Sequence, residues 1–104
     1  MSSCVIAAPA SVTVRSVAAF GRDLAVAFDA GEHFSLDIDA LVEADLSFVQ
    51  LLHAARAHLA TEGKSIRLAR PAGPAVTALL ERAGFLADPA PADIDFWFHG
   101  DCPR

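Results

Sequence analysis

The chain has 104 residues, of which 54% are hydrophobic and 20% charged, and its net charge is −5. This length and composition predict a single domain over residues 1–104 with a hydrophobic core, not a disordered chain. Eight basic residues against thirteen acidic ones do not supply the basic face that nucleic acids or anionic membranes require, so neither is expected as a partner. Because the sequence has no apolar run of about 20 residues and no basic residue before its first apolar run, we expect a cytoplasmic protein without membrane insertion.

The first third of the chain predicts two strands on either side of a helix. Residues 5–8 are a short apolar run that Pro9 ends, which is typical of a strand. Apolar residues then recur at helical spacing over 13–28, and Ala30 and Gly31 are a fitting end. Over 34–38, apolar and polar residues alternate, which indicates a second strand.

The clearest helix is predicted over 48–62, where either Asp45 or Ser47 can cap the free N–H groups and Gly63 ends the helix. Four apolar residues share one stripe of it and should face the core, namely Phe48, Leu52, Ala55 and Leu59. The remaining elements are a strand over 66–69, a helix over 74–83, and a strand or an aromatic cluster capping the core over 94–98. Strands that alternate with helices imply an α/β fold with parallel pairing and right-handed crossovers.

Acidic and cysteine residues offer little for metal or cofactor chemistry. Asp37 and Asp39 share a strand face and Asp45 follows, but no further ligand comes at a recognisable spacing, so the polar side of a strand is the favoured interpretation. Cys4 and Cys102 lie near opposite ends and are expected to be free thiols in the cytosol. We therefore expect no cofactor, no metal and no catalytic group.

Two histidines lie on the clearest helix. His53 and His58 are five residues apart, which separates them by roughly 140° around the helix, so they cannot share one metal ion. One alternative is a phosphotransfer protein in which His53 or His58 accepts phosphate. Such proteins are helical bundles, and the predicted strands favour ordinary surface histidines instead.

The segment from Phe34 to Leu86 resembles the STAS family, the sulfate-transporter and anti-sigma-factor-antagonist domain. In that family an Asp at a strand end leads to a second Asp, two hydroxyl residues and a Gly at the start of a helix, which Asp37 and Asp45 match in part. Two later signatures also match in order and spacing, namely the Gly-Lys that precedes a strand (residues 63–66) and the Gly-Phe that ends a helix (residues 83–85).

The resemblance implies a mixed, mostly parallel sheet of four to five strands with helices on one side, and a non-enzymatic role in binding another protein. In some members, phosphorylation of the hydroxyl residue directly after the second Asp is the switch. Here Leu46 occupies that position, Ser47 follows, and Phe48 replaces the Gly. A leucine cannot accept phosphate, so we predict constitutive binding, with Ser47 as the one substitute acceptor.

The outer face of the predicted 48–62 helix carries Gln50, His53 and Ala57, which are small or weakly charged for a solvent-facing surface. A partner helix could approach it closely, although alanine is also simply a good helix former. We predict that this face and the helix start bind the partner. The candidate partners are a kinase or chemotaxis component, an anti-sigma factor, or, as the alternative, a subunit of an ABC-type lipid transporter.

Overall fold

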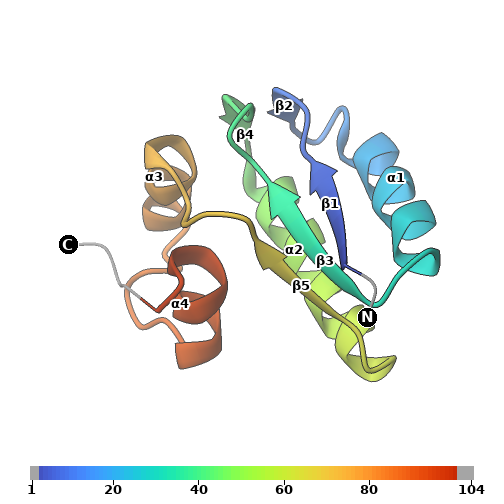
Figure 1. Ribbon diagram of the computed structural model, residues 1–104. Helices are drawn as coiled ribbons and strands as arrows, with labels where there is room; N and C mark the ends of the chain where they lie inside the picture. Colours follow the sequence, from blue (N-terminus) through green and yellow to red (C-terminus); the bar gives the residue numbers. More distant parts are fainter. Residues whose placement is uncertain (1–2, 101–104) are drawn as a thin grey trace.

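A computed structural model describes residues 3–100 and contains two layers (Figure 1). The elements, in chain order, are β1 (Ser3–Ala7), β2 (Ser11–Val12), α1 (Val17–Asp29), β3 (His33–Asp37), β4 (Glu43–Ala44), α2 (Leu46–Thr61), β5 (Ser65–Leu68), α3 (Pro74–Arg82) and α4 (Pro91–Phe98). The predicted α/β class is confirmed. The predicted helix over 13–28 begins later, because residues 13–16 form a turn in which Ser16 N donates to Thr13 O (2.9 Å).

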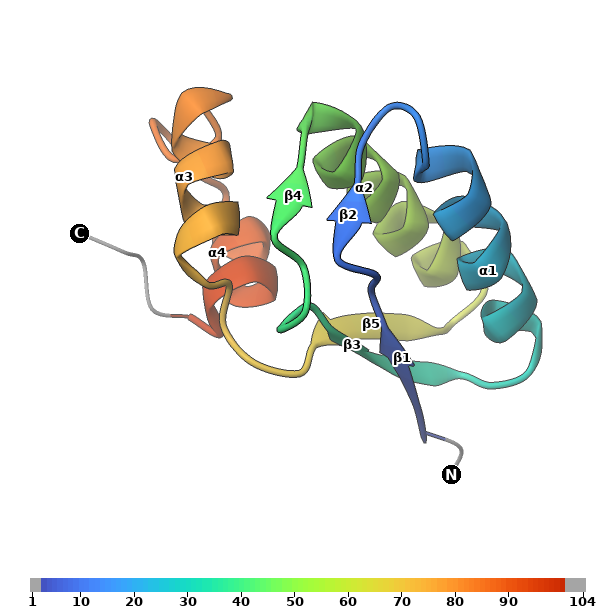
Figure 2. The same ribbon diagram turned by 90° about the horizontal axis from the view of Figure 1, so that it is seen from above.

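The main sheet has the strand order β1-β3-β5, and both pairs are parallel. The order never reverses direction, so two right-handed crossovers place α1 and α2 on the same face of the sheet. Figure 2 shows both helices above that face. The expected arrangement with helices on one side is therefore present, and side chains on the other face, such as those of Val5 and Arg67, are exposed.

A second, two-stranded parallel sheet, β2 with β4, continues the line of β1 and β3. Ala8 N donates to Asp37 O (2.8 Å) and Val42 N to Ala10 O (2.8 Å), so the two chain segments stay side by side between the sheets. The four to five strands that the resemblance implies are thus five, divided between two sheets instead of forming one. Strands of two residues are too short to show a period-2 pattern, which is why the sequence did not indicate them.

The core lies between the main sheet and the two helices that cover it. Alternation directs Phe34 and Leu36 of β3 and Leu68 of β5 inward, and all three are buried. The stripe predicted on α2 is buried against them, since Phe48, Leu52 and Leu59 are each 0% exposed. The core-facing side of α2 was therefore predicted correctly.

Residues 94–98 form part of helix α4, so the prediction of a strand over this segment is wrong. Aromatic residues favour strands in isolation, but Pro91 begins a helix here. The helix buries Phe96, Trp97 and Phe98, and the ring of Trp97 lies 6.2 Å from that of Phe48. The expected aromatic contribution to the core is thus supplied by a helix, and α4 lies beside β5 (Figure 1).

Candidate functional site

The start of α2 is organised by one carboxylate. Asp45 is the N-cap residue in extended conformation, and its Oδ1 accepts hydrogen bonds from the backbone N–H (3.0 Å) and the hydroxyl of Ser47. Its Oδ2 accepts from Val14 N (2.9 Å), which lies in the turn after β2. Of the two caps that the sequence allowed, Asp45 therefore fills the role, and it also ties α2 to the β2 segment.

These bonds also set the charge state of the cap. The hydroxyl of Ser47, followed by the backbone N–H of Val14, favours the ionised carboxylate and holds the pKa of Asp45 below its usual range. A negative charge next to the free N–H groups of a helix start is favourable. The carboxylate is consequently charged at neutral pH, and the hydroxyl of Ser47 is directed at it.

Leu46 lies at the first position of α2, and 42% of its surface is exposed. Four, seven and eleven residues further on, Gln50, His53 and Ala57 are exposed too. These spacings place all four residues on one stripe of the helix, opposite the buried one. We refer to Leu46, Gln50, His53 and Ala57 as the α2 stripe.

The far end of the α2 stripe opens onto a groove of about 360 Å³ between α2 and the start of β5. Its lining side chains come from both elements, namely His53, Arg56, Ala57, Ala60, Lys64, Ser65 and Ile66. Both cations are already engaged. Arg56 pairs with Asp93 of α4 (3.0 Å) and stacks over the ring of Phe96 (4.4 Å), and Lys64 Nζ donates to Phe28 O (2.7 Å).

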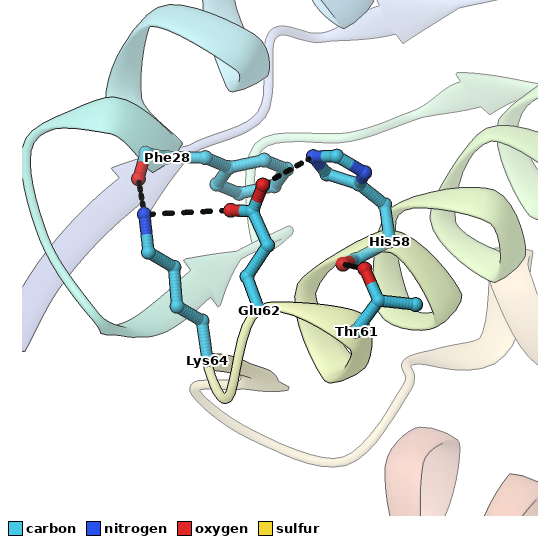
Figure 3. Close-up of polar contacts among 5 residues, drawn as sticks. All are labelled: Phe28, His58, Thr61, Glu62 and Lys64. Carbon is cyan, nitrogen blue, oxygen red and sulfur yellow. Dashed lines mark hydrogen bonds and ion pairs between the residues drawn. The ribbon is translucent and has the colours of Figure 1, made fainter.

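His58 lies outside the α2 stripe, at the C-terminal end of the helix (Figure 3). Its Nε2 is 3.5 Å from Glu62 Oε2, and Glu62 also faces Lys64 Nζ at 3.6 Å. His58 is thus part of a small polar network that joins α2 to the end of α1. The two histidines are placed apart, as the helical spacing predicted.

The three aspartates considered as a cluster use separate partners. Asp37 Oδ1 accepts from Asp39 N (2.8 Å), and Asp39 pairs with Arg70 (2.9 Å), while Asp45 caps α2. Between residues 3 and 100, no group of three or more acidic, histidine or cysteine side chains could hold a metal ion. Cys4 forms no disulfide within residues 3–100, and Cys102 lies outside the described residues.

Comparison with protein-family models identifies the family to which the chain belongs. The family model described as "Mlab, STAS domain" matches residues 1–87. The chain belongs to the STAS domain family. No curated protein and no solved structure matches it. STAS domains are generally binding modules without enzymatic activity, and they typically interact with other proteins. Helix α4 lies beyond the matched residues.

Several features of the site were not predicted from the sequence. No local pattern links Val14 to Asp45, because the two are 31 residues apart and only the β2–β4 pairing brings them together. The groove depends on Arg56 and Lys64; in the sequence, Lys64 was considered only as part of the Gly-Lys signature, and Arg56 was not considered. Within the described residues, no helix has the length and apolar character to cross a membrane.

Proposed function

We propose that this STAS domain binds a protein partner constitutively through the start of α2 and the α2 stripe, in a bacterial signalling system built around a kinase, an anti-sigma factor or a chemotaxis component. The observation that carries the proposal is the exposed Leu46 at the position where phosphoregulated members have their acceptor hydroxyl. A leucine accepts no phosphate, and its exposed apolar side chain can be buried against a partner.

The geometry around Leu46 supports the absence of a switch. The hydroxyl of Ser47 is bonded to the charged carboxylate of Asp45, so phosphorylation would break this bond and place a second negative group beside it. The rest of the α2 stripe consists of Gln50, His53 and Ala57, and α2 contains no acidic residue from Leu46 to Thr61. A partner helix with an apolar or mildly acidic face would complement it.

The test is a capture experiment with the 104-residue chain as bait in lysate of the source organism. Ala57→Glu adds bulk and charge in the middle of the α2 stripe and should reduce partner capture at least tenfold without unfolding the domain. The matched control is Ala75→Glu, which makes the same change at an exposed alanine of α3. Equal capture by both variants would contradict a docking role for the α2 stripe.

Two further results of the same experiment distinguish the alternatives. The identity of the captured protein separates a signalling partner from a subunit of an ABC-type lipid transporter. Intact-mass analysis of the bait reports phosphate on Ser47, or an acid-labile phosphate on His53 or His58. Phosphate on Ser47, together with loss of capture in Ser47→Asp but not in Ser47→Ala, would replace the constitutive model with a phosphoregulated one.

A further inference from the structure

The two outer edges of the main sheet differ in how they are protected. Along β5, Leu68 O accepts a hydrogen bond from His99 Nε2 (2.9 Å), α4 packs against the strand, and Lys64 and Arg67 contribute charge. Charges and covering elements are the usual means by which a sheet edge is kept from pairing with another chain. The β5 edge therefore carries the protection expected of a monomeric surface.

Among residues 3–100, no charged side chain or covering element protects the β1 edge in this way. β1 occupies the end of the order β1-β3-β5, and the chain carries no charged residue from Ser3 to Val14. Val5, in the centre of the strand, is 76% exposed. Pro9 comes after the strand has ended and so does not interrupt it. An uncharged edge of five residues is a template for pairing with another strand.

The hydrogen-bond pattern identifies which backbone groups are available on this edge. Ala8 N donates to Asp37 O on β3 (2.8 Å), and residues of a strand alternate in the side to which their backbone groups point. The backbone groups of Cys4 and Ile6 therefore face β3, and those of Ser3, Val5 and Ala7 face outward. The outward set is symmetric about Val5.

We propose that β1 pairs antiparallel with β1 of a second copy of this chain, so that two three-stranded sheets join into one six-stranded sheet with a two-fold axis at Val5. Val5 would then exchange both backbone hydrogen bonds with Val5 of the second copy, and Ser3 would do so with Ala7 on either side. All the outward-facing groups of Ser3, Val5 and Ala7 find partners in this register. The two Val5 side chains would meet on the open face of the sheet.

Helix α1 is compatible with such a pair. It lies alongside β1 (Figures 1 and 2). Gly21 marks the flank of α1 that faces α2, because a Cβ there would lie 3.5 Å from Leu51 Cδ1. The opposite flank carries the exposed Ala19, Asp23 and Val26, and because Asp23 has the same charge in both copies, the contact rests on the strands and not on the helices.

This pairing uses the edge of the sheet farthest from β5, so it leaves the groove between α2 and β5 free. A five-residue strand pair buries less than the roughly 1,000 Å² expected of a strong interface, so we expect a weak dimer that dissociates on dilution. Within a dimer, two α2 stripes would be available to a partner with repeated binding sites, and the linked sites would raise the overall affinity.

The test is sedimentation equilibrium of the full chain over a concentration series. We expect a monomer–dimer equilibrium whose dissociation constant rises at least tenfold in Val5→Lys, since the two lysines would lie directly opposite each other. Val42→Lys is the matched control, because Val42 is also 76% exposed but lies before β4, and it should leave the equilibrium unchanged. A monomer throughout the series, open-ended association, or a dimer that both variants weaken equally would overturn the proposal.

A cross-link tests the register itself. In a background of Cys4→Ala and Cys102→Ala, Val5→Cys places two thiols at a pair whose Cα atoms are about 5.5 Å apart, within the range of a disulfide. Mild oxidation of the concentrated protein should yield a covalent dimer, and the same background with Val42→Cys should not. Equal cross-linking of both variants would contradict the pairing at Val5.

Discussion

The two faces of α2 have opposite chemistry although they belong to the same sixteen residues. The inner face consists of large apolar side chains that pack against the main sheet, with Phe48, Leu52 and Leu59 fully buried. The outer face, the α2 stripe, carries one exposed leucine and then small or polar residues. The inner face therefore determines the fold, and the outer face can vary with the partner without affecting the core.

The largest expected effect is on the inner face. Leu52→Ala removes a side chain that is 0% exposed, so it should lower the free energy of unfolding by about 2–5 kcal/mol through lost burial and a residual cavity. Gln50→Ala, two residues earlier on the α2 stripe, should change it by less than about 0.5 kcal/mol. Urea denaturation of both variants gives the comparison, and similar losses would mean that the two faces are not distinct.

The contrast between the two faces of α2 was predictable from the sequence because it follows from the helical repeat of apolar residues. Apolar residues at helical spacing identified the inner face, and the remaining positions, Gln50, His53 and Ala57, then had to point outward. The family resemblance rested on Asp37, Asp45 and the two glycine signatures, and the match over residues 1–87 confirms it.

The features that were missed depend on contacts between distant segments. Residues 94–98 form a helix because Phe96, Trp97 and Phe98 are buried beyond the end of the sheet, and local aromatic content gave no sign of this. The five strands fall into two sheets because both chain segments are interrupted, at residues 8–10 between β1 and β2 and at residues 38–42 between β3 and β4. Tertiary packing overrode local preference at both points.

Arg56 joins the two faces, since it lies at their border and reaches α4. Its guanidinium pairs with Asp93 (3.0 Å), donates to Ala92 O (3.2 Å) and stacks over Phe96. Arg56→Met should therefore cost about 1–2 kcal/mol, the sum of a partly exposed ion pair and a cation–π contact. Arg56→Lys keeps the charge but loses the planar stacking, and should recover only part of the loss.

The measurement is again denaturation, with the fluorescence of Trp97, the single tryptophan, as a probe next to the altered contact. If Arg56→Met unfolds at the same urea concentration as the original chain, then α4 is held by its buried aromatic residues alone.

The next prediction concerns the opposite border of α2, where the half-buried Leu51 lies next to Gly21 of α1. Gly21 lies inside α1, and a Cβ there would meet Leu51 Cδ1 at 3.5 Å, an ordinary contact. Gly21→Ala should therefore stabilise the domain by about 0.5–1 kcal/mol by favouring the helix. Gly84→Ala should do the reverse, because Gly84 has φ +81°, which alanine rarely adopts. Thermal denaturation that gave the same sign for both substitutions would contradict this account.

The smallest expected effect concerns the start of α2, where the two faces meet at Asp45. Its hydrogen bonds from Ser47 and Val14 lower the pKa of the folded state below that of the unfolded chain. The ionised carboxylate therefore stabilises the fold at any pH above the pKa of the unfolded chain, and this contribution is lost as the pH falls through the folded pKa.

Asp45→Asn should have a lower melting temperature than the original chain at pH 6, and this difference in melting temperature should disappear below about pH 4. Ser47→Ala removes the largest cause of the lowered pKa, so it should move the acid-induced loss to higher pH. Melting temperatures of the three proteins between pH 2 and pH 6 provide the measurement. A gap between Asp45→Asn and the original chain that stays constant over that range would mean that the cap acts through geometry alone. The charge on Asp45 would then not be the reason that Ser47 is held against it.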